Sequence, residues 1–107
     1  MTEILKTIGV VALVLFMAGC ATRVVNTVAH LEPVPSKTEV LAEFSETQLS
    51  QGEAYYASSC AQCHKLFDPD SRDPEQWNTV LKRMIPKTQL TYDESKLVRA
   101  YLVAHSK

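Results

Sequence analysis

Residues 60–64 read Cys-Ala-Gln-Cys-His, and this C-x-x-C-H run constrains the chain more than any other feature. Two thiols three positions apart lie on one helical turn, so each is placed to form a thioether with one of the two vinyl-derived carbons of a porphyrin. The next residue, His64, then projects toward the iron as its proximal ligand. The motif predicts one covalently attached haem c, held through sulfur by Cys60 and Cys63 and through iron by His64.

Two other chemistries use a C-x-x-C pair. A redox dithiol of the thioredoxin kind lies beside a β-α-β pattern, and no strand pattern precedes Cys60. A structural zinc site needs a second pair of ligands, for which His30 and His105 are the remaining candidates. Haem attachment is the preferred interpretation, and a non-haem role for the pair is the alternative.

The N-terminus has the pattern of an export signal. The haem motif requires such a signal, because haem is attached in this way outside the cytoplasm. A polar start containing Lys6 leads into an apolar stretch over residues 8–17, which is shorter than the about 20 residues of a membrane-spanning helix. The run Met17-Ala18-Gly19-Cys20 resembles a bacterial lipobox, although Met17 stands where that pattern usually has Leu. We therefore predict a lipoprotein signal peptide over residues 1–19 and lipid anchoring at Cys20, with an ordinary cleaved signal as the alternative. Because Ala21 rather than Asp follows the cysteine, the resemblance implies the periplasmic side of the outer membrane.

The charge balance argues against a nucleic-acid partner. Residues 1–19 contain one acidic and one basic residue, Glu3 and Lys6, so the remainder has 10 Lys and Arg against 11 Asp and Glu and stays at net −1. Nucleic-acid binding would want a clustered basic face, whereas the charges here alternate in sign along the chain.

Residues 20–44 are expected to join the lipidated N-terminus to the folded domain. Pro33 and Pro35 favour extended backbone for the residues before them, and residues 21–44 show no sustained hydrophobic period. We interpret the segment as a tether. The alternative is a strap packed over the domain, which is favoured by the apolar residues Val24, Val25, Val28 and Leu31.

Three helices and no strand are predicted in the domain itself, residues 45–107, so the fold class is all-α. The first helix runs from about Glu46 into the haem motif. The second ends at Pro86 and the third occupies the C-terminus. The last two begin with capping boxes, formed by Asp73 with Gln76 and by Thr91 with Glu94. The expected buried stripes are Leu49, Gly52 and Tyr56; Trp77, Val80, Leu81 and Met84; and Leu97, Val98, Tyr101 and Leu102.

With these elements in place, residues 45–106 resemble a small class I cytochrome c. The resemblance rests on the haem motif, on Gly52 and Tyr56 eight and four positions before Cys60, and on Tyr101-Leu102 in the last helix. It implies a cytochrome c-type fold of about three main helices around one covalently bound haem. In that family the first and last helices cross, and a glycine at the crossing, here Gly52, lets an aromatic residue, here Tyr101, approach closely.

The same resemblance implies further contacts to the haem. The segment from Trp77 to Met84 looks like that of short monohaem cytochromes whose methionine ligand lies at the end of a Trp-containing helix. Met84 is therefore expected as the distal iron ligand, and Trp77 is expected to pack against the porphyrin. Met84 is also the only methionine after residue 19. A gap-filling core methionine, or ligation by His105 or His30, is the alternative.

One family contact has no clear counterpart, namely the proline that orients the proximal histidine. Pro69 is the candidate, with its carbonyl accepting from His64 Nδ1; a plain turn proline is the other interpretation. The basic residues Lys82, Arg83 and Lys87 flank Met84, and they form either a docking rim for an acidic partner or an ordinary solvated helix face.

The sequence thus predicts an electron carrier and not an enzyme: a monohaem protein that transfers single electrons between a protein donor and a protein acceptor, with no small-molecule substrate. A first alternative is a gas-binding or sensing cytochrome with an open sixth site, which ligation by Met84 would exclude. A second is a haem-containing subunit with a docking role in a larger respiratory complex.

Overall fold

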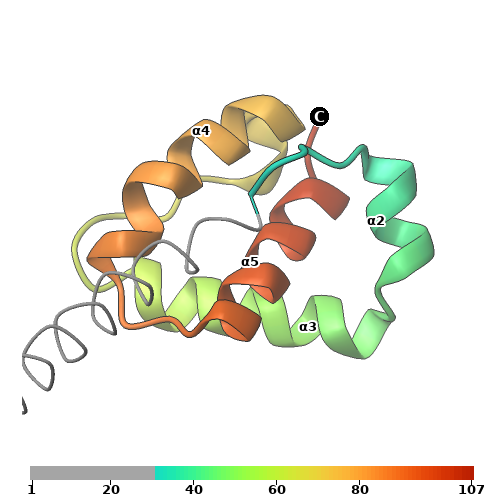
Figure 1. Cartoon of the computed structure of the whole chain (residues 1–107). Coiled ribbons are helices and arrows are strands. Elements are labelled where there is room, and N and C mark those ends of the chain that lie inside the picture. Colours follow the sequence, from blue (N-terminus) through green and yellow to red (C-terminus); the bar gives the residue numbers. More distant parts are fainter. Residues whose placement is uncertain (1–30) are drawn as a thin grey trace, which may run out of the picture.

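The computed structural model describes residues 31–107, and the predicted signal peptide, Cys20 and His30 lie outside this described part. Four α-helices follow one another: α2 (Lys37–Glu43), α3 (Glu46–Tyr55), α4 (Pro74–Met84) and α5 (Tyr92–Ala104) (Figure 1). One π-helical turn (Tyr56–Cys60) and two 3-10 turns (Pro69–Ser71 and Ile85–Lys87) lie between them. Residues 31–107 contain no strand, so the predicted all-α class is confirmed for the described part, which also has no helix long and apolar enough to cross a membrane.

Each of the four α-helices begins with a complete capping box. The pairs are Ser36 with Glu39, Ser45 with Gln48, Asp73 with Gln76 and Thr91 with Glu94. In each pair the first side chain accepts from the backbone of the second residue, and the second side chain accepts from the backbone of the first. The two boxes predicted for α4 and α5 are confirmed. The boxes of α2 and α3 use the same S-x-x-E/Q spacing, which the sequence analysis did not use.

Helices α3 and α5 cross in close contact at Gly52. A Cβ atom at this position would lie 2.0 Å from the Leu97 carbonyl oxygen and 2.9 Å from Tyr101 Cβ. Both distances are shorter than side chains allow, so only glycine lets the two backbones approach this far. The expected approach of Tyr101 to Gly52 is confirmed, and it fixes where α3 delivers the next turn, which contains Tyr56.

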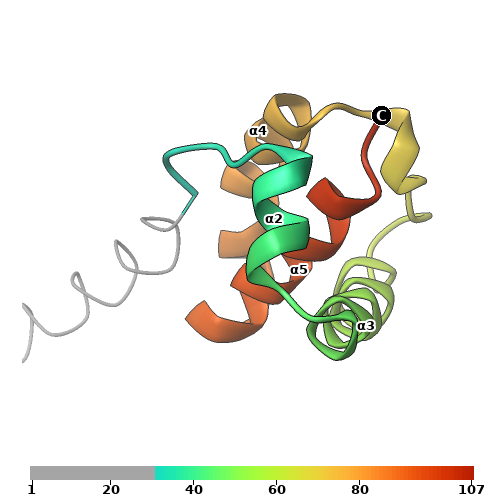
Figure 2. The same cartoon turned by 90° about the vertical axis from the view of Figure 1, so that its right-hand side faces the viewer.

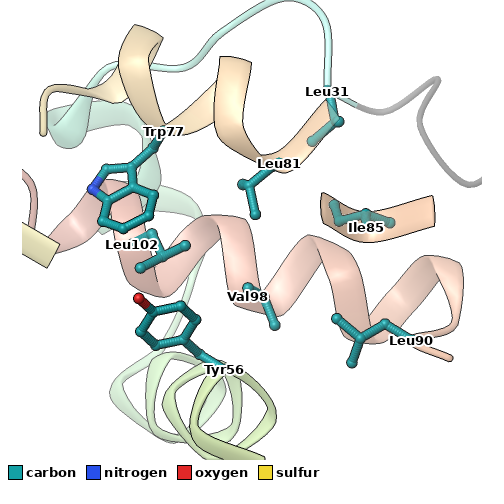
Figure 3. Packing of buried hydrophobic residues seen from close by; sticks show 8 residues of the cluster. All are labelled: Leu31, Tyr56, Trp77, Leu81, Ile85, Leu90, Val98 and Leu102. Carbon is teal, nitrogen blue, oxygen red and sulfur yellow. The ribbon is translucent and has the colours of Figure 1, made fainter. Parts of the chain in front are cut away.

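The main core fills the space between α3, α4 and α5. Trp77 and Leu81 point from α4 toward α5, and Tyr56 reaches the same layer from the end of α3 (Figure 3). The cluster consists of Leu31, Tyr56, Trp77, Leu81, Ile85, Leu90, Val98 and Leu102. Of the expected stripe on α5, Val98 and Leu102 are fully buried, whereas Leu97 and Tyr101 are half-buried at the crossing with α3.

The tether interpretation is wrong for residues 31–44, because this part of the segment packs on the domain. Leu31 is completely buried in the main core, and Val40 of α2 is 1% exposed in a second cluster with Ala100, Val103 and other residues of α5 and α3. Helix α2 stands beside α5 in both views (Figures 1 and 2). The folded part therefore begins well before Ser45. The three helices predicted for residues 45–107 are present as α3, α4 and α5, and α2 is an additional helix in the segment before them.

Candidate cofactor site

A cavity of about 770 Å³ opens between α4 and the chain that follows α3. Its volume lies within the roughly 300–1,000 Å³ typical of small-molecule and cofactor sites. Cys60, Cys63 and His64 line it from the C-x-x-C-H motif. Trp77, Val80, Leu81 and Met84 line it from α4. The fold thus brings both predicted thioether positions and both predicted iron ligands to one cavity.

The motif follows directly on the π-helical turn that extends α3. This turn ends at Cys60, and residues 61–63 form a turn of their own. Inserted π-helical turns occur frequently at functional sites. Cys60 is half-buried, Cys63 is exposed, and neither forms a disulfide. Both sulfur atoms are therefore available for covalent chemistry.

The surroundings of Cys60 do not favour a reactive dithiol. Burial, with a smaller contribution from neighbouring Cys63, raises the pKa of the Cys60 thiol, whereas a reactive dithiol needs a lowered thiol pKa. A helix rather than a strand precedes Cys60. Within residues 31–107, no group of three or more His, Cys, Asp or Glu residues is placed to hold a metal ion.

The His64 ring is oriented by a backbone contact. Nδ1 lies 2.8 Å from the carbonyl oxygen of Lys65. A carbonyl oxygen can only accept, so this contact requires the proton on Nδ1 and leaves the lone pair on Nε2. The ring itself is exposed and lies 5.7 Å, centroid to centroid, from Phe67. Nε2 is the nitrogen that is free to bind a metal.

Pro69 does not have the contact that the family resemblance implied. Its carbonyl accepts the indole N–H of Trp77 at 2.7 Å, while His64 donates to Lys65. The reason is burial, because Trp77 is 1% exposed and its N–H needs an internal acceptor. Pro69 therefore positions the wall of the cavity rather than the histidine.

Tyr56 holds the loop that carries His64 against the core, a role that the sequence analysis missed. Its hydroxyl donates to the Phe67 carbonyl at 2.6 Å, and its ring meets Trp77 edge-on at 6.2 Å between centroids. Burial raises the pKa of Tyr56, so the hydroxyl keeps its proton and remains a donor at neutral pH. A buried tyrosine four positions before the motif is the signal that points to this role.

The charged residues that line the cavity are all cationic: Arg72, Arg83 and Lys87, with no Asp or Glu among the described lining residues. This contrasts with the net charge of −1 of the whole chain. Lys82, predicted as part of the same basic rim, is not among the lining residues and forms an ion pair with Glu32 instead. The cavity therefore favours a group that carries negative charge.

His105 lies away from this cavity. It is exposed at the end of α5, where its ring stacks on Tyr101 at 5.0 Å between centroids, and it is not among the lining residues. Met84 is half-buried at the last position of α4 and lines the cavity. Of the two histidines considered as alternatives to Met84, only His105 lies in the described part, and it lies outside the cavity.

Comparisons with protein-family models, with curated proteins and with solved structures found no match for this chain. The functional argument therefore depends on the residues of the cavity. They combine two thiols, an imidazole nitrogen with a free lone pair, a thioether sulfur, aromatic and aliphatic walls, and three cations.

Proposed function

We propose that this chain is a membrane-anchored periplasmic cytochrome c with one haem, which carries single electrons between protein redox partners. The domain over residues 45–107 would be a small class I type, supplemented by the packed strap from residue 31. The observation that carries the proposal is that a single cavity collects Cys60, Cys63 and His64 of the motif together with Met84 of α4.

The residues of the cavity fit a haem in several respects. Cys60 and Cys63 have free thiols at the spacing that thioether formation needs, and His64 offers Nε2 as a ligand because Nδ1 is engaged with a carbonyl. Three cations without an acidic neighbour in the lining match the two carboxylates of the porphyrin. Trp77 and Leu81 supply an apolar wall for its face.

When bound, the haem would supply the reversible one-electron change between ferric and ferrous iron. The protein's own residues would bind, orient and shield it. His64 and Met84 would hold the iron, and a methionine ligand raises the reduction potential. Because residues of the protein itself would bind the iron from both sides of the cavity lining, we propose a carrier and not an enzyme or a gas sensor.

The attachment of haem is tested with Cys60→Ala/Cys63→Ala, expressed together with haem-maturation machinery. The wild type should keep a haem stain on a denaturing gel, and the double variant should show none, because both thioether bonds are absent. Ala61→Ser is the matched control, since it changes one of the two exposed residues between the cysteines and keeps both thiols. A stain of wild-type intensity in the double variant would overturn the proposal.

The sixth ligand is tested with Met84→Leu, which removes the sulfur at a packing cost of less than about 1.5 kcal/mol. The wild-type ferric protein should show the near-infrared charge-transfer band of a thioether ligand. The variant should lose this band and have a lower potential. Should the wild type lack the band, or the variant keep its low-spin spectrum and its potential, the gas-binding or bis-histidine alternative replaces the carrier.

Membrane anchoring at Cys20 is a separate part of the proposal. A single acyl chain binds membranes only marginally, whereas the diacylglyceryl and N-acyl chains of a bacterial lipoprotein would make a lasting anchor. Metabolic labelling with palmitate should mark the wild type, and Cys20→Ser should be unlabelled and soluble in the periplasm. Label retained by Cys20→Ser would assign the anchor to another residue.

A further inference from the structure

We propose that the strap, residues 31–44, positions the distal ligand Met84 by holding α4 from the side opposite the cavity, through Leu31 and Glu32. The inference rests on the proposed function, because it concerns a ligand to a haem iron. It deepens that proposal by giving a role to a segment that precedes the cytochrome-like domain over residues 45–107. Leu31 and Glu32 would be positioning residues, since they contact α4 and do not line the cavity.

Helix α4 presents different residues to the cavity and to the strap. Val80 and Met84 are four positions apart and line the cavity. Asn78 and Lys82 are also four positions apart, but both contact Glu32 of the strap and neither lines the cavity. Successive residues of an α-helix are turned by about 100°, so residues two positions apart, such as Lys82 and Met84, point to nearly opposite sides. The strap and the cavity therefore lie on opposite sides of α4.

Leu31 provides the apolar part of the contact with α4. Its side chain is completely buried, and it lies in one cluster with Leu81 of α4 and Ile85 of the following turn (Figure 3). Leu81 is three positions before Met84, and Ile85 is the residue directly after it. Removal of a buried leucine side chain leaves a cavity that the surrounding structure fills only in part. Leu31 thus packs at the end of α4 that carries Met84.

Glu32 provides the polar part of the contact. Its Oε1 accepts from Asn78 Nδ2 at 3.3 Å and also forms an ion pair with Lys82. Asn78 is 3% exposed, so loss of the Glu32 oxygen would remove the acceptor of a buried amide donor, which is costly. The side chains of Glu32 and Lys82 are both exposed, and an exposed ion pair contributes little. The hydrogen bond to Asn78 is therefore the more important of the two contacts.

The rest of the strap is attached to α5 and to the end of the chain. Val40 packs with Ala100 and other residues in a buried cluster that contains no residue of α4. Lys37 Nζ donates to the Ser106 carbonyl at 3.0 Å. These contacts hold one part of the strap on α5, while its first two residues hold α4. A movement of α4 that withdraws Met84 from the cavity would therefore break the contacts of those two residues.

A contact that holds α4 in place makes Met84 harder to displace from the iron by another ligand. Such a contact can favour the Met84-bound state by no more than its own free energy. For a buried leucine replaced by alanine, this free energy corresponds to a factor of about thirty or more in an equilibrium constant. For a buried donor that loses its acceptor, the factor is about five or more. Added imidazole competes with Met84 for the iron, so its dissociation constant measures the effect.

The test is a titration of the haem-loaded ferric protein with imidazole, followed by loss of the near-infrared thioether band. Leu31→Ala should lower the dissociation constant of imidazole by about tenfold or more. Val40→Ala is the matched control, because it removes buried methyl groups from the same strap outside the cluster that contains α4. It should change the dissociation constant by less than about twofold, as expected for a site that does not act on α4.

The stability of both variants in urea separates positioning from general destabilisation. If the two variants changed the dissociation constant in proportion to the stability that each loses, the strap would act only through the stability of the whole domain. That result would overturn the inference while leaving the haem, and hence the proposed function, intact.

A second pair of variants decides the case if Leu31→Ala does not fold, as judged by circular dichroism. Glu32→Ala should lower the dissociation constant of imidazole by about fivefold or more. Glu43→Ala removes the same charge from an exposed position of α2 and should change it by less than about twofold. Equal constants in these two variants would overturn the inference. A wild type without covalent haem would instead refute the proposed function, and the role of the strap with it.

Discussion

Replacing Gly52 with alanine tests the helix crossing on which the position of Tyr56 depends. The new Cβ would lie 2.0 Å from the Leu97 carbonyl oxygen, and an ordinary contact begins at 3.4 Å, so the helices must separate by about 1.4 Å. The atom that is met belongs to the backbone of α5 and cannot rotate away. The second obstacle, Tyr101 Cβ at 2.9 Å, is also directly attached to that backbone.

Two opposing effects determine how much Gly52→Ala changes the free energy of unfolding. Overpacking of a close contact costs about 1–3 kcal/mol, and the rigid carbonyl places Gly52→Ala at the upper end. Alanine is favoured over glycine within a helix by about 1 kcal/mol, which offsets part of this cost. We expect the free energy of unfolding to fall by about 2 kcal/mol. For a domain of this size that lowers the melting temperature by about 8–16 °C.

The assay is urea and thermal unfolding followed by circular dichroism, with Gln51→Ala as the control. Gln51 is the preceding residue of α3 and is exposed, so its replacement should leave stability within about 0.5 kcal/mol. If Gly52→Ala is as stable as the wild type or more so, α3 and α5 do not approach as described, and the reasoning from backbone contact fails.

Three further outcomes follow from the packing. Trp77→Phe should lower the free energy of unfolding by about 1–3 kcal/mol in urea, because the Pro69 carbonyl loses its indole donor; unchanged stability would speak against that bond. Val40→Ala removes two buried methyl groups and should lower the free energy of unfolding by about 2 kcal/mol, whereas Leu41→Ala, at an exposed position, should lower it little. Equal effects of the two variants would return residues 31–44 to the tether interpretation. Burial raises the pKa of Tyr56 in the folded protein. As pH rises, the unfolded chain therefore loses the phenol proton before the folded protein does. The contribution of Tyr56 to the free energy of unfolding is thus present below about pH 10 and lost as pH rises above it. Tyr56→Phe should therefore flatten stability curves measured between pH 9 and 12, and an identical slope would contradict this assignment.

Several features were predictable because a few neighbouring residues determine them. The start of α4 at Asp73 needs only the side chain of Gln76 three positions later, and the start of α5 at Thr91 needs only Glu94. The crossing at Gly52 was also predictable, although only through the family resemblance. The gathering of the motif and α4 around one cavity agrees with that resemblance, and the haem itself stays a prediction.

Other features depended on distant partners and could not be found in the same way. Pro69 was assigned to His64 because the two are close in sequence, but the buried indole of Trp77 takes its carbonyl. The segment from Leu31 was interpreted as a tether because its prolines are visible locally. Its partners lie far along the chain: Leu31 belongs to the cluster that contains Leu81 and Ile85, and Val40 packs with Ala100 of α5, some sixty positions away.

By itself, the sequence determined the all-α class, the starts of α4 and α5 and the presence of two thiols and an imidazole in the C-x-x-C-H motif, since these depend on spacings of three or four residues. Only the tertiary structure decided that Arg72 lies between Phe67 and Trp77 with its carbonyl held by Lys107, and that the strap covers α5. The physical reason is that capping and helical spacing act within one turn of the chain. Burial, by contrast, and the choice of partner for a buried polar group depend on which distant segments compete for the same space.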